Sequence, residues 1–147
     1  HRPHRGRMIL VSAADDRMGT GFNHRRQSRD KALRRDLICE AAGAPVWMNA
    51  YSLRQFKDEA AQADLHCSKN FLFDAGDGEF CFAENILVSA AENRAEKIIL
   101  YRWNRIYPAD IYFDIDLSSG WFLSESRDFA GKSHEKITKE VYLREQE

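Results

Sequence analysis

Short apolar runs alternate with one amphipathic pattern in the first third of the chain. The run Met8–Ala13 predicts a buried strand, and the glycine-containing stretch after it predicts a loop. Residues 29–42 predict a helix, with Ser28 as the expected N-cap and Gly43 as the residue that ends it. The helix prediction depends on apolar residues spaced four apart: Leu33, Leu37 and Ala41.

The remaining elements are shorter and mostly strand-like. Pro45 introduces a second strand, and Ser52 is the expected cap of a second helix over residues 53–62. A short helix is expected within residues 86–96. Five further runs predict strands: 64–68, 79–84, 97–103, 111–117 and 121–126. The tail, residues 134–145, fits both a helix and a strand.

The order of these elements predicts the fold class. Strands that alternate with helices near the N-terminus indicate a parallel sheet, and consecutive strands near the C-terminus indicate antiparallel additions. We therefore expect a single α/β domain over residues 8–147, with a mixed, mostly parallel sheet. Residues 1–7 are interpreted as a tag or flexible arm.

Charge is distributed unevenly along the 147 residues, although the net charge is only −1. Residues 1–35 carry ten Lys/Arg and three Asp/Glu, whereas residues 36–147 carry twelve and twenty. This asymmetry indicates either an anionic partner or two halves that attract each other in the fold. Both interpretations stay open.

The cysteines and the hydropathy pattern limit the class of protein. Three cysteines without a Cys-x-x-Cys pair argue against a disulfide framework or a structural zinc site. No apolar run approaches the ~20 residues needed to cross a bilayer, and no signal-peptide pattern is present. We expect a cytoplasmic protein with no membrane partner.

Several stretches resemble dihydrofolate reductase. They are MILVSAADDRMGTGFNH, APVWMNAYSLRQF, EFCFAEN, AEKIILYRW and ADIYFDIDLSSGWFLSES. They match, in order, the family's first strand and mobile loop, a strand–helix unit, two later strands and the C-terminal segment. The resemblance covers most of Met8–Leu143, and it implies a dihydrofolate reductase-like fold in which the tail is the last antiparallel strand.

The resemblance also implies NADPH as cofactor, but the cofactor motifs are not matched. The family's phosphate-binding Gly-Arg-x-Thr is replaced by four other residues: Asn49, Ala50, Tyr51 and Ser52. Glu84 and Asn85 stand where the family has a glycine pair. Close approach of a phosphate favours residues without a Cβ, and a carboxylate repels it. The cofactor is therefore left open.

A second resemblance, on RRQSRD, WMN-Y and SHEKIT, is to small bacterial proteins that sometimes carry a ribonuclease Z label. That metallo-enzyme class needs a His-x-His-x-Asp-His cluster to hold two zinc ions. The five histidines of this chain are not arranged in this way, so no metal site is predicted.

Asp30 is the acid that the helical pattern singles out. It precedes Leu33 by three residues and Leu37 by seven, so it lies on the inward stripe of the helix. In the resembled family an acid in this first turn binds the pterin ring and assists protonation, which implies that role for Asp30. The alternative is an acid that complements the helix dipole.

Arg25, Arg26 and Arg29 precede or open the same helix. A helix N-terminus flanked by arginines is an anion site, and the alternative is a solvated basic loop. His24 and His134 are a candidate acid/base pair for phosphodiester cleavage, provided that the last strand returns beside the first loop.

Two residues near the second strand are further ligand-binding candidates. Asn49 stands at a strand–helix junction, where ligands of open α/β sheets bind, and Tyr51 follows it. The nearby Trp47 is interpreted as a core residue, and Trp103 and Trp121 as packing residues.

Two functional hypotheses follow. The first is a protein that binds a pterin- or nucleotide-like heterocycle or a phosphate-bearing ligand, with reductase activity left open. The alternative is a nucleic-acid-directed protein, either a metal-independent ribonuclease or an RNA-binding module. An interaction protein without pocket chemistry is a third possibility, and the sequence leaves open the oligomeric state and whether the protein is an enzyme.

Overall fold

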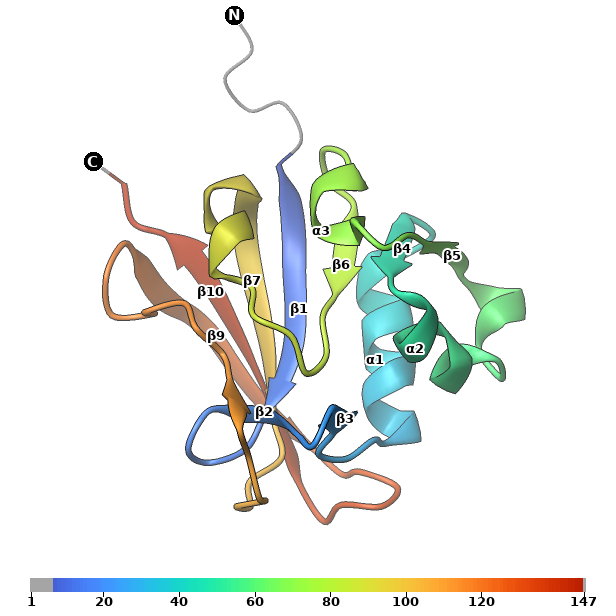
Figure 1. Ribbon diagram of the computed structural model, residues 1–147, viewed down its shortest axis with the longest axis vertical. Coiled ribbons are helices and arrows are strands. Elements are labelled where there is room, and N and C mark those ends of the chain that lie inside the picture. The colour runs from blue at the N-terminus through green and yellow to red at the C-terminus, as the bar shows by residue number, and fades with distance from the viewer. Residues whose placement is uncertain (1–6, 147) are drawn as a thin grey trace, which may run out of the picture.

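The structure, a computed structural model, describes residues 7–146 and contains one large sheet. Its strands are β1 (Met8–Ala14), β4 (Pro45–Met48), β5 (Asp64–Cys67), β6 (Phe80–Phe82), β7 (Ala95–Arg102), β9 (Trp121–Phe129) and β10 (Ile137–Arg144). They lie in the order β5-β4-β6-β1-β7-β10-β9 (Figure 1).

The sheet is mixed, as the order of elements predicts. β5, β4, β6, β1 and β7 run parallel to one another, whereas β10 is antiparallel to both β7 and β9. The tail is thus a strand, which confirms the choice that the family resemblance favoured. The carboxyl ends of five parallel strands meet at one edge of the sheet, and β10 begins at that edge.

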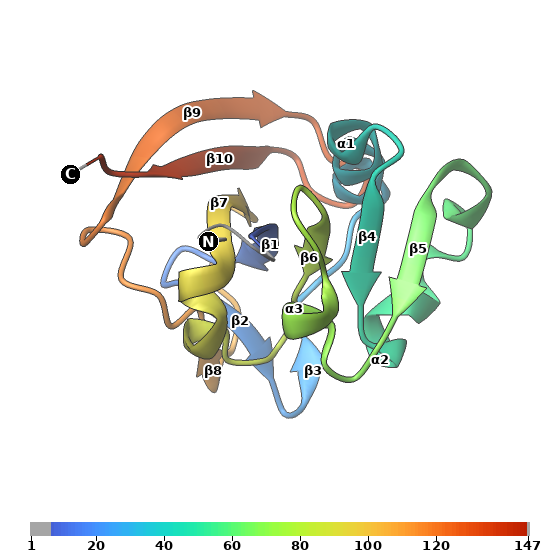
Figure 2. The same ribbon diagram turned by 90° about the horizontal axis from the view of Figure 1, so that it is seen from above.

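Helices cover both faces of the sheet. Successive side chains of β1 point to opposite faces, so β1 contributes apolar side chains to the packing on each face. Ile9 and Val11 pack with the apolar stripe of α1 (Lys31–Ala41) on one face. Met8 and Leu10 pack on the other face with α3 (Phe71–Asp74) and the 3₁₀ helix η3 (Ser89–Arg94). Figure 2 shows these helices on opposite sides of the strands.

A second, three-stranded sheet lies beyond the carboxyl end of β1 (Figure 1). It consists of β2 (Gly19–Phe22), β3 (Arg25–Arg26) and β8 (Ile111–Tyr112). The sequence pattern predicts only a loop around β2, and this prediction is wrong, because strands this short produce no measurable alternation. Gly21 packs so closely that a Cβ there would lie 2.4 Å from the Asn85 Cβ.

Three further expectations need correction. Asp30, not Ser28, caps α1, because its carboxylate accepts from the Ala32 N–H at 2.8 Å. The second helix is shorter and earlier than expected. It is capped by Asn49, not Ser52, and consists of α2 (Ala50–Leu53) followed by the 3₁₀ turns η1 (Arg54–Phe56) and η2 (Ala60–Gln62). The strand expected over residues 111–117 is limited to β8, and α3 was missed.

Most of the expected N-terminal arm, residues 1–7, lies outside the described residues. Arg7 leads into β1, and its N–H donates to Asp77 at 2.7 Å. Between residues 7 and 146, no helix combines the length and apolar character that a membrane span requires.

Candidate functional site

Polar side chains from several loops converge at the carboxyl edge of the parallel strands. Asp15 follows β1, Glu84 follows β6, and Trp103 and Tyr107 follow β7. His134 lies in the loop that leads into β10, which begins at the same edge because β10 runs antiparallel. Ligands of open α/β sheets bind at such an edge.

Asp30 and His134 form a buried, hydrogen-bonded pair at this edge. The Asp30 Oδ2 atom lies 2.9 Å from the His134 Nδ1 atom, and the two side chains are 0% and 3% exposed. The carboxylate also accepts from the Lys132 N–H, the Ser133 N–H and the Ser133 hydroxyl at 2.8–3.1 Å. Gly131 makes this contact possible, since a Cβ there would lie 2.7 Å from Oδ2.

The surroundings of Asp30 keep it ionised. Burial alone raises the pKa of its carboxyl group, but hydrogen bonds from Lys132, His134, Ser133 and Ala32 outweigh burial and hold the pKa well below its ordinary value. An ionised carboxylate only accepts hydrogen bonds, so we assign a proton to His134 Nδ1.

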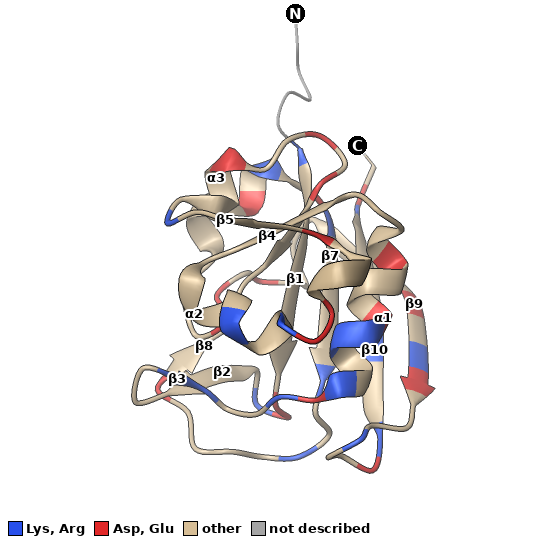
Figure 3. Cartoon of the chain, turned by 90° about the vertical axis from the view of Figure 1, so that its right-hand side faces the viewer, with Lys and Arg blue, Asp and Glu red and all other residues tan. Residues whose placement is uncertain are grey.

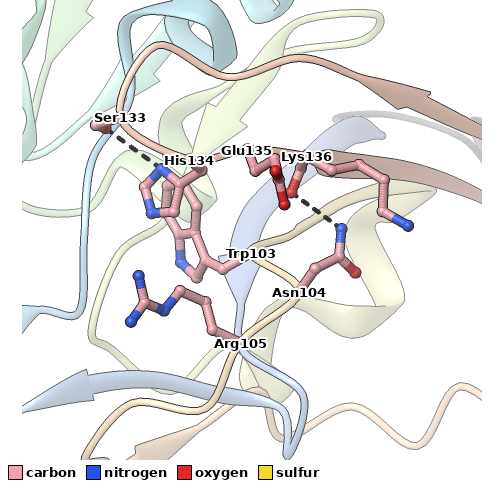
Figure 4. Close-up of a pocket in the computed structure, with 7 residues that line it drawn as sticks. All are labelled: Trp103, Asn104, Arg105, Ser133, His134, Glu135 and Lys136. Carbon is pink, nitrogen blue, oxygen red and sulfur yellow. Dashed lines mark hydrogen bonds between the residues drawn. The ribbon is translucent and has the colours of Figure 1, made fainter.

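The other ring nitrogen of His134 faces two hydroxyl groups. Nε2 lies 2.9 Å from Ser28 Oγ and 3.0 Å from the Tyr107 hydroxyl. With the proton on Nδ1, Nε2 has a single lone pair to accept from one of them. The Trp103 ring stacks on the imidazole, with centroids 4.4 Å apart and planes at 22° (Figure 4), and thus fixes the ring plane.

Asp15 holds the two loops that carry those hydroxyl groups. This buried carboxylate accepts from Gln27 Nε2, beside Ser28, and from the Tyr107 N–H, both at 3.0 Å. It also accepts from the Gly19 N–H at 2.8 Å. Burial alone raises the pKa of Asp15, but these hydrogen bonds outweigh it and lower the pKa.

Ser28 lines an open surface pocket of about 460 Å³, which we call the basic pocket. It is lined by Arg25, Arg26, Gln27, Ser28, Arg29, Tyr51 and Ser133. Basic segments run from β3 into the start of α1 in Figure 3. Within residues 7–146, the exposed Arg25 and Arg29 form no ion pair, in contrast to Arg26, which binds both oxygens of Glu84 at 2.9 and 3.2 Å.

Tyr51 lines the basic pocket, but its side chain packs against Arg26. Its hydroxyl accepts from the Arg26 N–H at 2.9 Å, and the Arg26 guanidinium lies 4.2 Å from the ring centroid. Asn49 is half-buried, and its side chain accepts from the Ser52 N–H at 3.0 Å as the cap of α2. Asn49 is not among the residues that line the basic pocket.

The structure separates the expected histidine pair. His24 is exposed in the turn between β2 and β3, and no contact within the described chain joins it to His134. His134 instead contacts Asp30, Tyr107 and Ser28, and the sequence pattern had indicated Ser28 only as a helix cap. Ser28 and Asp30 lie two residues apart in RRQSRD, and this spacing is the signal that was missed.

The NADPH-binding positions of the resembled family are a poor fit for that cofactor. Glu84, in place of a glycine, is 7% exposed, and its carboxylate accepts from the Ser52 hydroxyl at 2.7 Å and from Arg26. The next residue, Asn85, is in contact with Gly21. A cofactor phosphate here would meet a buried carboxylate and a covered strand end.

The described residues contain no group of three or more His, Cys, Asp or Glu side chains placed to hold a metal ion. Cys39, Cys67 and Cys81 are free thiols, and burial raises the pKa of the Cys81 thiol to about 12. Trp103 and Trp121 are buried, and Trp47 packs against the core, as expected.

Comparison with known proteins gives a structural match and no sequence match. No protein-family model and no curated protein matches the sequence. Among solved structures, dihydrofolate reductase from Enterococcus faecalis, complexed with NADP(H) and RAB-propyl, has a TM-score of 0.65 at 9% identity. The match covers 96% of this chain and 98% of that one. The protein therefore has a dihydrofolate reductase-like fold.

Proposed function

We propose that the protein binds a small molecule that carries a phosphate or carboxylate group, and that the basic pocket holds this group. The observation that carries the proposal is the pair of exposed guanidinium groups on Arg25 and Arg29, which line one cavity and have no ion-pair partner within residues 7–146. Arginine forks match the geometry of phosphate and carboxylate oxygens.

The pocket is large enough for more than an inorganic anion. A cavity of about 460 Å³ lies within the range of small-molecule sites, roughly 300–1,000 Å³. A pterin- or nucleotide-like heterocycle linked to the anionic group is the ligand class that we favour. Reductase chemistry is not part of the proposal, because Glu84 occupies the position at which the resembled family approaches NADPH.

A thermal-shift and calorimetry series tests this proposal. The probes are inorganic phosphate, a nucleoside 5′-monophosphate and folate, each at low ionic strength. A ligand at about 100 times its Kd stabilises the protein by about 2.7 kcal/mol, which is measurable as a rise in Tm. Tighter binding of the monophosphate or folate than of phosphate supports the heterocycle.

Matched variants assign the binding to the basic pocket. Arg25→Ala and Arg29→Ala are expected to weaken binding about tenfold or more, since each removes a charge-assisted contact. Arg35→Ala removes an equally exposed charge from α1 outside the lining and is expected to bind like the parent. No shift with any of the three probes would refute the proposal.

RNA is the alternative ligand with phosphate chemistry, and a short single-stranded RNA is included as a separate arm. Binding to several phosphates falls steeply with salt, whereas binding of one monophosphate falls weakly. Tight RNA binding with a steep salt slope, combined with no response to monophosphates, would favour the nucleic-acid hypothesis.

A further inference from the structure

We propose that Ser28, His134 and Asp30 form a hydrolytic triad, in which Ser28 is the nucleophile toward carboxylic esters. Ser28 Oγ lies 2.9 Å from His134 Nε2, and His134 Nδ1 lies 2.9 Å from Asp30 Oδ2. These are the two hydrogen bonds that such a triad needs: nucleophile to base, and base to an orienting carboxylate. The contacts join residues 106 and 104 positions apart in the chain.

The three side chains become less buried from the orienting carboxylate to the base and then to the nucleophile. The Asp30 side chain is 0% exposed and that of His134 is 3% exposed, whereas Ser28 is half-buried and lines the basic pocket. From the basic pocket, a substrate therefore meets Ser28 before the buried side chains of His134 and Asp30. The outer nitrogen of His134 is directed at Ser28, a residue of the pocket wall.

Asp30 is placed to act as a positioning residue. Its Oδ2 atom is held by the Ser133 N–H at 2.8 Å and its Oδ1 atom by the Ala32 N–H at 2.8 Å, so the carboxylate cannot rotate away from the imidazole. With Nδ1–H donated to Asp30, Nε2 is left as the proton acceptor for Ser28. The stacked Trp103 ring keeps the imidazole in the plane that serves both contacts.

Tyr107 competes with Ser28 for the same nitrogen. Its hydroxyl lies 3.0 Å from Nε2, and its N–H is anchored to Asp15 at 3.0 Å. Because Nε2 has one lone pair, it accepts a hydrogen bond from only one of the two hydroxyl groups at a time. In the resting arrangement Tyr107 donates to Nε2, and in the reactive arrangement Ser28 donates to it. Removal of the Tyr107 hydroxyl leaves Ser28 as the only donor among these contacts.

The chemical steps balance with water as the only co-reactant. Ser28 Oγ attacks the ester carbonyl carbon while its proton passes to His134 Nε2. The bond from carbon to the leaving oxygen breaks, and this oxygen takes the proton from Nε2 and departs as an alcohol. Water then attacks the acyl-serine, again giving its proton to Nε2, and Ser28 leaves with that proton. One ester and one water give one carboxylic acid and one alcohol.

The substrate class rests on the proposed anion site. Arg25 and Arg29 line the same cavity as Ser28, so the preferred esters carry a phosphate or carboxylate away from the scissile bond. The nucleophile itself does not depend on that site, and an uncharged probe tests it separately.

Labelling with an uncharged alkyl fluorophosphonate, followed by intact-mass and peptide analysis, is the first experiment. We expect one adduct per chain on Ser28, and none on that peptide in Ser28→Ala. Ser126→Ala is the matched control, because Ser126 is an exposed serine of β9 outside the basic pocket, and its labelling should be unchanged. His134→Gln should label at least about 100-fold more slowly, as expected for loss of a general base.

Two further variants separate the roles. Tyr107→Phe should label at least as fast as the parent. Folded Asp30→Asn should retain its affinity for the probe while the rate of inactivation falls at least about 100-fold; a merely structural role would leave that rate unchanged in the folded fraction. Absence of labelling in the parent, or labelling unchanged in Ser28→Ala, would overturn the triad.

Ester hydrolysis distinguishes the triad from the anion site. p-Nitrophenyl acetate and the singly anionic p-nitrophenyl succinate are compared in the parent and in Arg25→Ala. With both proposals right, the succinate ester reacts faster and loses that advantage in the variant. Labelled Ser28 without a preference for the succinate ester retains the triad and rejects the anionic substrate. Anion binding without labelling retains the basic pocket and rejects the triad.

Discussion

Replacement of Asp30 by asparagine measures how much of the fold depends on one buried carboxylate. Five donors point at its two oxygens: the Ala32, Lys132 and Ser133 N–H groups, the Ser133 hydroxyl and His134 Nδ1. Asparagine can keep the oxygen that caps α1 and remains a good N-cap. Its NH₂ group then faces donors on the 131–134 loop, which lose their acceptor.

The expected loss is about 3 kcal/mol of unfolding free energy, because a hydrogen bond to a charged group contributes about 1.5–3 kcal/mol and an unsatisfied buried donor costs about 1–3 kcal/mol. For a chain of this size, this corresponds to a Tm lower by roughly 6–12 °C. Asp30→Ala also removes the helix cap and should lose about 1 kcal/mol more. Urea unfolding monitored by circular dichroism measures each value.

The contribution of Asp30 to the free energy of unfolding depends on pH. The pKa of Asp30 is lowered in the folded state, so the folded protein holds fewer protons than the unfolded chain between the two pKa values. Its contribution is therefore complete above the ordinary value of 3.8 and is lost as the pH falls toward the lower folded pKa. The gap between the parent and Asp30→Asn should narrow below about pH 4. A gap under about 1 kcal/mol at neutral pH would refute the assigned hydrogen bonds.

Three further expectations follow from the structure. Gly131→Ala would place a Cβ 2.5 Å from the His134 carbonyl oxygen and 2.7 Å from Asp30 Oδ2. Fluorophosphonate labelling and Tm should therefore both fall, and an unchanged Tm would contradict this packing. Glu59→Ala leaves Arg34 as a buried unpaired charge and should cost about 3–5 kcal/mol in urea unfolding, whereas a loss below 1 kcal/mol would show that the pair is solvated. Raising salt from about 50 to 200 mM should weaken phosphate binding at the basic pocket but leave Tm nearly constant, since buried pairs are screened little.

The regular part of the fold was predictable because its signals are local. The buried run at β1 and the apolar stripe of α1 follow from periodicity alone, and helical phase also predicted that Asp30 is buried, which its 2% exposure confirms. The short strands β2 and β3 and the broken second helix were not predictable in this way. They are too short for a period to be read, and tertiary contacts such as the one between Gly21 and Asn85 determine them.

The candidate site was predicted only in part, for a similar reason. Five residues were expected to bind the ligand: Arg25, Arg26, Arg29, Asn49 and Tyr51. The three arginines and Tyr51 line the basic pocket, whereas Asn49 does not. The partner of Asp30 lies 104 residues away, on a loop whose own sequence has no periodic signal. Periodicity shows which side of a helix is buried but not which distant side chain meets it.

The structure resolves the uneven charge along the chain into two contributions. Two N-terminal arginines neutralise acids of later segments: Arg26 with Glu84 and Arg34 with Glu59. This part of the asymmetry is internal attraction between the two halves. Arg25 and Arg29 form no ion pair within residues 7–146, and both line the basic pocket. A net charge of −1 is therefore compatible with an anionic ligand, because the field in a cleft depends on the charges that line it and not on the total.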